Sequence, residues 1–286
     1  MTERLLVCTD LDRTLIPNGP QPESPNARKY FAALVSRVEV ELSYVSGRHP
    51  ALVQEAVAAY GLPVPDFVIG DVGTSLYRIE RDGEWTPQTE WEEQIGKDWE
   101  GATGRDLKGF LSGIKALRLQ ESSKQGRFKL SYYAPLDADP DELVEEVRER
   151  LSEQGIRTSL IWSVDEPEGV GLLDVLPARA SKYHAIAFLI TQEGVDIEDT
   201  VFSGDSGNDL EPLTSPIPAV LVANAHPSVR EQARRIANER GHPEQLYCAK
   251  GGFIGMNGNY SAGILEGIAH YHPIVRRWLD DATEAR

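Results

Sequence analysis

The segment Asp10-Leu11-Asp12-Arg13-Thr14-Leu15 is the most informative part of the sequence, because it directly follows the apolar run Leu5-Leu6-Val7-Cys8. The apolar run predicts a buried strand, so the acids stand at its carboxyl end. Open α/β sheets hold their ligands outside the carboxyl ends of the strands. Asp10 and Asp12 point from the same side of an extended chain and repel each other unless a cation or a proton lies between them. This favours a catalytic, Mg²⁺-binding pair, with an acidic turn as the alternative.

Three further segments carry residue types that a phosphoryl-transfer site needs. Ser46-Gly47-Arg48 follows an alternating, strand-like run over 38–45, and it reads as a phosphate clamp at a strand end. Lys182 opens a periodic segment over 182–190, where the helix dipole disfavours an ammonium unless an anion compensates. Gly204-Asp205-Ser206-Gly207-Asn208-Asp209 follows a strand-like run over 200–203. Its two acids and an amide form an oxygen-rich set suited to Mg²⁺.

In this order, the four segments resemble the four signature motifs of the haloacid dehalogenase superfamily of aspartate-nucleophile phosphatases. More narrowly, the chain is similar to the sucrose-6-phosphate phosphatases and to their relatives that act on mannosylfructose phosphate. The similarity includes 71–74, 128–132, 174–177, 224–225 and 261–270. Arg13 departs from the pattern, since the family more often has glycine or asparagine there.

The resemblance implies a role for each motif residue. Asp10 would be the nucleophile, and Asp12 the acid and then the base. Mg²⁺ would be held by the carboxylates of Asp10 and Asp205 and by the backbone carbonyl of Asp12, while Asp209 would support the site rather than bind the metal directly. The residues implied in binding the phosphate or the rest of the substrate are Ser46, Gly47, Arg48, Thr74, Gln120, Lys129, Lys182 and Asn208.

The order of strand-like and helical segments predicts an α/β fold. Strand-like runs at 5–9, 38–45, 66–69, 173–176, 200–203 and 219–222 alternate with helical segments near 25–37, 51–60, 182–193 and 227–239. Such alternation predicts a doubly wound, Rossmann-like parallel sheet. The character changes over 75–172, with hairpin-like turns, aromatic strands and a single long helix. We expect a core domain of residues 1–74 plus 173–286 and an inserted α+β cap of residues 75–172, which in this family closes over the site.

Composition limits the partners and the compartment. The 286 residues carry a net charge of −16, with a pI near 4.8 and no basic tract. This argues against nucleic acid and membrane surfaces as partners. A sugar phosphate would also be repelled at long range, so the site has to supply local positive charge. Two cysteines form no disulfide framework, and the first apolar run is too short for a signal peptide or a span, so we expect a cytoplasmic protein. The oligomeric state stays open, with a monomer favoured.

Three hypotheses follow for the function. The first is a phosphatase of a disaccharide phosphate, with sucrose-6-phosphate as the best candidate and mannosylfructose or glucosylglycerol phosphate as alternatives. The second is a phosphohexomutase of the same superfamily, which would need an activating bisphosphate and would return the phosphate to a sugar. The third is a catalytically idle module that binds a sugar-phosphate synthase such as sucrose-phosphate synthase.

Overall fold

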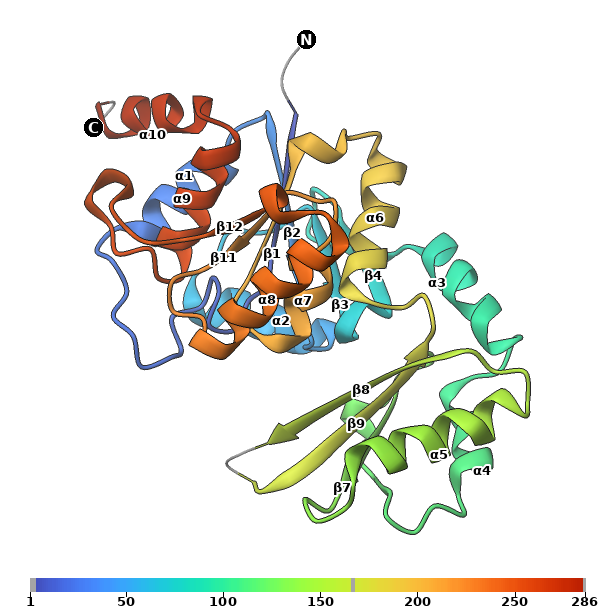
Figure 1. Cartoon of the computed structure of the whole chain (residues 1–286). Helices are drawn as coiled ribbons and strands as arrows, with labels where there is room; N and C mark the ends of the chain where they lie inside the picture. Colours follow the sequence, from blue (N-terminus) through green and yellow to red (C-terminus); the bar gives the residue numbers. More distant parts are fainter. Residues whose placement is uncertain (1–3, 166–167, 285–286) are drawn as a thin grey trace.

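The computed structural model describes residues 4–165 and 168–284, which form two sheets with helices around them (Figure 1). The larger sheet contains β1 (Leu5–Thr9), β2 (Val40–Val45), β3 (Phe67–Gly70), β4 (Ser75–Ile79), β5 (Trp85–Pro87), β10 (Thr200–Gly204), β11 (Ala219–Leu221) and β12 (Leu246–Cys248). Its order is β12-β11-β10-β1-β2-β3-β4-β5. The strands from β12 to β3 are parallel, and β4 and β5 are antiparallel additions at one edge. The expected parallel α/β core is confirmed.

Alternate residues of the central strands feed two hydrophobic clusters, one on each face of this sheet. Leu5 and Val7 of β1 pack with α1 (Ala27–Val35), α2 (Pro50–Tyr60), α9 (Ser261–Tyr271) and α10 (Ile274–Glu284). Leu6 and Cys8 pack on the side of α6 (Lys182–Glu193), α7 (Leu210–Leu213) and α8 (Pro227–Arg240). This is the period of two that a strand buried on both faces requires. Within the described chain, no helix has the length and apolar character needed to cross a membrane.

The smaller sheet belongs to a second unit, called the cap below, which lies below the larger sheet in Figure 1. Its strands β6 (Arg118–Leu119), β7 (Leu130–Ala134), β8 (Thr158–Asp165) and β9 (Val170–Pro177) are antiparallel neighbours in the order β6-β7-β9-β8. The cap also contains α3 (Thr89–Gly96), α4 (Gly104–Leu111) and α5 (Pro140–Ser152). Leu143, Val147 and Leu151 of α5 form a buried stripe at a spacing of four residues.

The division between the two sheets differs from the expected boundaries at 74/75 and 172/173. Strands β4 and β5, expected in the insertion, extend the larger sheet beside β3. The run 173–176, expected as a core strand, belongs to β9 in the smaller sheet. An apolar run has the same local pattern in either sheet, because its partner strands are far away in the sequence. By sheet membership, the chain leaves the larger sheet after Pro87 and the smaller one after Pro177.

The segment that leads from the cap back to the core is held by a buried carboxylate. Asp98 has no exposed surface and accepts hydrogen bonds from the backbone N–H and the guanidinium of Arg179, at 2.8 and 2.9 Å. Arg157 adds a second guanidinium at 2.6 Å. Because Arg179 lies three residues before Lys182, this cluster anchors the start of α6 to the cap.

Candidate active site

The site lies where three parallel strands end side by side. Asp10 follows β1, Ser46 follows β2 and Asp205 follows β10, and these strands are neighbours in the sheet. The backbone N–H of Asp10 donates to the carbonyl of Ser203 at 2.9 Å, which continues the pairing of β1 with β10. Three segments, the first and last of them nearly 200 residues apart in sequence, therefore meet at one edge, because the carboxyl ends of parallel strands coincide.

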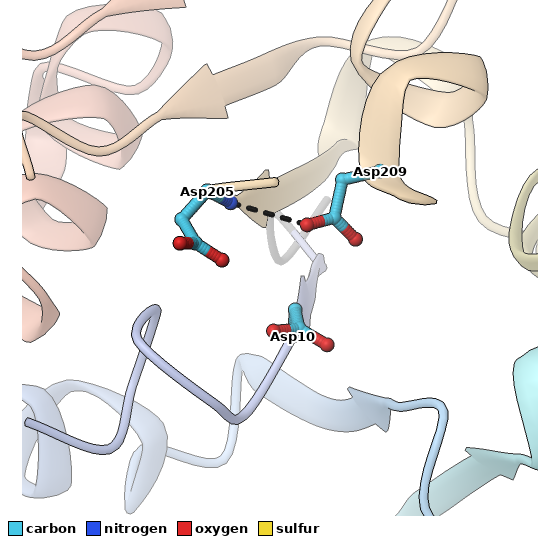
Figure 2. A group of neighbouring side chains, drawn as sticks. All are labelled: Asp10, Asp205 and Asp209. Atoms are coloured by element: carbon cyan, nitrogen blue, oxygen red, sulfur yellow. Dashed lines mark hydrogen bonds between the residues drawn. The ribbon is translucent and has the colours of Figure 1, made fainter. Parts of the chain in front are cut away.

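Three buried carboxylates lie around a common space at this edge (Figure 2). Asp10, Asp205 and Asp209 each place one oxygen within 4.8 Å of the others. Burial raises the pKa of Asp10 to about 7, although the charge of Lys182 opposes the rise. Burial also raises the pKa of Asp205 to about 6, and the nearby charge of Asp209 adds to it. The raised pKa values show that these crowded carboxylates lack a positive charge to balance them, and a bound divalent cation would supply it. Their oxygens are also the ligands that Mg²⁺ prefers, so these residues fit Mg²⁺.

Lys182 connects this cluster to α6. It is the first residue of the helix, where Ser181 caps the N-terminus by accepting from the N–H of His184. Its buried ammonium donates to Asp10 Oδ1 at 2.9 Å, to Asp209 Oδ1 at 2.6 Å and to Asn208 Oδ1 at 3.3 Å. Burial lowers the pKa of Lys182, but its two carboxylate partners outweigh burial and hold the pKa above its ordinary value. The sequence predicted that an anion has to compensate this ammonium in the first turn of a helix, and Asp10 and Asp209 provide it.

Asp209 is oriented by donors on both of its carboxylate oxygens. Oδ1 accepts from Lys182. Oδ2 accepts from the backbone N–H of Asp205 at 3.1 Å (Figure 2) and from that of Ser206 at 3.2 Å. The Asp209 side chain comes so close to the backbone at position 204 that a glycine is required there, since a Cβ would lie 2.6 Å from Asp209 Cγ. For Asp10, among the described residues, only Lys182 donates to the carboxylate, at Oδ1. This leaves Asp10 Oδ2 for another ligand.

The Asp12 carboxylate is not part of the acidic cluster and has partners of its own. Arg48 binds it with two hydrogen bonds, from Nε to Oδ2 at 2.7 Å and from Nη2 to Oδ1 at 2.6 Å. Asn18 Nδ2 donates to the same Oδ1 at 2.8 Å. Burial raises the pKa of Asp12, but the hydrogen bonds from Arg48 outweigh burial and lower the pKa below its ordinary value. In this conformation, Arg48 is engaged with Asp12, and it holds Asp12 ionised.

A cavity of about 610 Å³ opens beside these residues, between the core and the cap. From the cap, Gln120, Lys129 and Asp174 line it. The predicted site residues that line it are Asp10, Asp12, Ser46, Gly47, Arg48, Gln120, Lys129, Asp205 and Asn208. Lys182 and Asp209 do not line the cavity. Lys182 is hydrogen-bonded to Asp10, which does line it, and Asp209 is hydrogen-bonded to Lys182. The predicted role of Thr74 does not fit its placement, because its hydroxyl donates to the carbonyl of Asp71 at 3.1 Å and it is not among the lining residues.

Several lining residues carry no role in the sequence prediction. Asp71 and Asp174 lie within quoted segments of the resemblance, and only the fold shows that both line the cavity. Burial raises the pKa of Asp71, and Lys129 opposes that rise. Asp71 and Val72 both have positive φ, at 51° and 62°, which is unusual for residues other than glycine. Backbone strain of this kind concentrates at functional sites. Arg13 and His226 line the core side of the same cavity.

Known proteins resemble this chain along nearly its whole length. A family model described as sucrose-6F-phosphate phosphohydrolase matches residues 3–272. A protein of Nitrosococcus oceani named "Putative HAD-like hydrolase" is 52% identical over 285 residues, which cover 99% of this chain and 76% of that protein. Sucrose-phosphatase 1 of Nicotiana tabacum is 28% identical over 94% of this chain. The match covers 59% of the tobacco protein, so the chain spans less than two thirds of that relative.

A solved structure agrees with these matches. It is the sucrose-phosphatase of a Synechocystis species in complex with sucrose and phosphate, at 25% identity and a TM-score of 0.71. The match covers 94% of this chain and 98% of that one. The likeness therefore extends over both the larger sheet and the cap.

Proposed function

Because this chain belongs to the sucrose-6F-phosphate phosphohydrolase family, within the haloacid dehalogenase superfamily, we propose that it is a Mg²⁺-dependent phosphatase of a disaccharide phosphate, with sucrose-6-phosphate as its substrate. The observation that carries the proposal is the environment of Asp10. One of its oxygens is held by a buried ammonium, and it lines a cavity closed on the other side by the polar cap residues Gln120, Lys129 and Asp174.

In the proposed reaction, Asp10 attacks the phosphorus atom and forms an aspartyl phosphate, which splits one hard displacement into two easier ones. Lys182 keeps Asp10 oriented, and Asp209 and Asn208 keep Lys182 in place. Asp10 and Asp205 would hold Mg²⁺ together with the backbone carbonyl of Asp12. When bound, Mg²⁺ neutralises charge on the transferring phosphoryl group.

Asp12 would protonate the departing sugar oxygen and then take a proton from the hydrolytic water. Proton transfer by a positioned side chain accelerates a reaction by about 10²–10⁴-fold. The Arg48 guanidinium is bonded to Asp12 at 2.6 and 2.7 Å, so it has to leave that carboxylate before Asp12 can carry a proton. A substrate phosphate in the cavity offers the competing anion. Ser46, whose hydroxyl lies at the end of β2 and lines the cavity, would hold a phosphate oxygen.

The cap would select the sugar. A cavity of about 610 Å³ accommodates a ligand of disaccharide size. Its cap wall carries hydrogen-bonding side chains rather than a purely apolar surface. A site built to hydrogen-bond sugar hydroxyls rejects analogues that lack them, because its buried polar groups would be left unpaired.

The test is Mg²⁺-dependent release of inorganic phosphate from sucrose-6-phosphate, mannosylfructose phosphate, fructose-6-phosphate and glucose-6-phosphate. We expect the highest kcat/KM with sucrose-6-phosphate, and no release by Asp10→Asn, which keeps the shape of the side chain. Preference for mannosylfructose phosphate would correct the substrate but keep the reaction. A chain that transfers phosphate between sugars only when a bisphosphate is added would be a mutase. A chain inactive on every substrate that still binds a sugar-phosphate synthase would be an idle module.

A further inference from the structure

Arg13 occupies a backbone conformation that arginine seldom adopts. Its φ is 57°, in the left-handed region. Two amides on other parts of the chain hold it there: Asn18 Oδ1 accepts from its N–H at 2.8 Å, and Asn224 Nδ2 donates to its carbonyl at 2.6 Å. Glycine and asparagine enter this region at lower cost. Nothing in the backbone therefore favours arginine at this position, and its role has to lie in the side chain.

The side chain of Arg13 contacts the proposed metal site. Its Nε lies 3.2 Å from Asp205 Oδ2. The Asp205 side chain is 4% exposed, whereas the Arg13 side chain is 44% exposed and lines the cavity. One guanidinium thus touches a buried carboxylate of the acidic cluster and also faces the space that the substrate would fill.

Charge balance gives this contact a consequence. When ionised, Asp10, Asp205 and Asp209 supply three negative charges, and Lys182 supplies one positive charge to Asp10 and Asp209. Arg13 supplies a second positive charge at Asp205, which leaves the cluster with one net negative charge instead of two. A divalent cation entering beside Asp205 meets the guanidinium at short range, where repulsion is strong because the site is largely buried. Once the cation is bound, the same guanidinium leaves a net positive site, which attracts an anion.

We infer that Arg13 is a built-in counter-ion that weakens Mg²⁺ binding to the empty site and turns from Asp205 to the bound anion in the loaded site, so that Mg²⁺ and phosphate bind cooperatively. This rests on the metal site of the proposed function but not on the identity of the sugar. Cooperativity of this kind is reciprocal, because the two ligands share one coupling free energy.

The experiment is calorimetric titration of the whole chain with MgCl₂ at low ionic strength, with and without saturating inorganic phosphate. Two variants remove the charge: Arg13→Gln keeps a long side chain, and Arg13→Asn suits the positive φ, so at least one should fold as judged by its melting curve. Arg13→Lys keeps the charge. Arg148→Gln, on the exposed face of α5, removes one positive charge from the cap and controls for net charge.

Without phosphate, we expect the charge-removing variants to bind Mg²⁺ about tenfold more tightly than the wild type. Phosphate should tighten Mg²⁺ binding several-fold more in the wild type than in these variants. Arg13→Lys and Arg148→Gln should behave as the wild type. Equal Mg²⁺ affinities in the wild type and the charge-removing variants, or an equal gain from phosphate, would overturn the inference.

A separate variant distinguishes this inference from the metal site itself. Asp205→Asn should abolish Mg²⁺ binding in both the wild-type and the Arg13→Gln backgrounds. If Asp205→Asn binds Mg²⁺ as the wild type does, the proposed metal site is wrong and the inference fails with it. If Asp205→Asn does not bind while Arg13→Gln matches the wild type, the metal site stands and only the role of Arg13 fails.

Discussion

Lys182 is the residue on which the stability of the site depends most. Its ammonium is buried between Asp10 and Asp209, so Lys182→Met would leave two buried carboxylates facing each other. We expect the free energy of unfolding of the metal-free protein to fall by about 3 kcal/mol, and phosphate release to fall by about 10²-fold or more. Urea unfolding and a phosphate-release assay measure the two effects.

The control variant for Lys182→Met is Lys115→Met, which removes a lysine from an exposed turn of the cap. It should alter the free energy of unfolding by less than about 0.5 kcal/mol. If Lys182→Met is as stable as Lys115→Met, the ammonium does not neutralise the cluster.

The raised pKa values of Asp10 and Asp205 predict how stability depends on pH. Both carboxyls ionise near pH 3.8 in the unfolded chain, but at about 7 and about 6 in the metal-free folded protein. Between these values the folded state binds more protons, so the two groups make the free energy of unfolding fall as pH rises from about 4 to 7. Asp205→Asn should remove the share of this decline that Asp205 contributes, about 2 kcal/mol between pH 4 and 6.

Urea titrations of the wild type and Asp205→Asn at pH 4.5, 6 and 7.5 measure the difference. Groups remote from the cluster titrate equally in both proteins, whereas loss of the Asp205 charge also lowers the pKa of Asp10 slightly, so only the gap between the two curves is interpreted. A gap that does not change with pH would contradict the prediction, and saturating Mg²⁺ should restore the stability of the wild type at pH 7.5.

At the scale of elements, the turn between β3 and β4 and the start of α6 are in direct contact. A Cβ at Gly73, where φ is 103°, would lie 2.3 Å from the carbonyl carbon of Ser181 and 2.7 Å from the N atom of Lys182. Gly73→Ala should therefore cost about 3 kcal/mol of stability, and it should lower phosphate release because α6 carries Lys182 into the site.

Gly61 offers a control that also has a positive φ but has no clash. It caps α2 with a φ of 59°, and a Cβ there would meet nothing within 4 Å. Gly61→Ala should cost only about 1 kcal/mol and leave phosphate release unchanged. Similar losses in Gly61→Ala and Gly73→Ala would mean that φ alone, not the contact with α6, sets the cost.

The elements also show the limits of local patterns. The helical periodicity over 182–193 matches α6, and the apolar run over 5–9 matches β1. The run 173–176 was correctly expected as a strand but assigned to the wrong sheet. Hydrophobic pattern indicates that a strand is buried, whereas its partner is set by contacts with residues far away in the chain.

The whole molecule carries a net charge of −16, which opposes the approach of an anionic substrate. Salt screens this long-range repulsion, so kcat/KM for a sugar phosphate should rise by about twofold between 10 and 150 mM KCl at fixed free Mg²⁺. The chemical step of the bound substrate should be unaffected, so kcat should stay constant. Steady-state kinetics over this range measure both, and a kcat/KM that falls with salt would mean that the cations of the cavity dominate the field.

Local sequence patterns were enough to predict the class of the fold and the main residues that meet at the site. Asp10, Ser46, Asp205 and Lys182 could be predicted because each directly ends a strand or opens a helix, and parallel strands bring their carboxyl ends to one edge. Their chemistry then follows from residue type alone.

The placement of the remaining residues became visible in the folded chain alone. In the folded chain, the Asp12 carboxylate binds Arg48, and Arg13 contacts Asp205. Asp174 and Lys129 line the cavity, whereas Thr74 does not. The physical reason is range: local patterns encode the period of an element and the residues at its ends. The direction of a side chain and the strand that a segment pairs with depend instead on contacts between residues far apart in the chain.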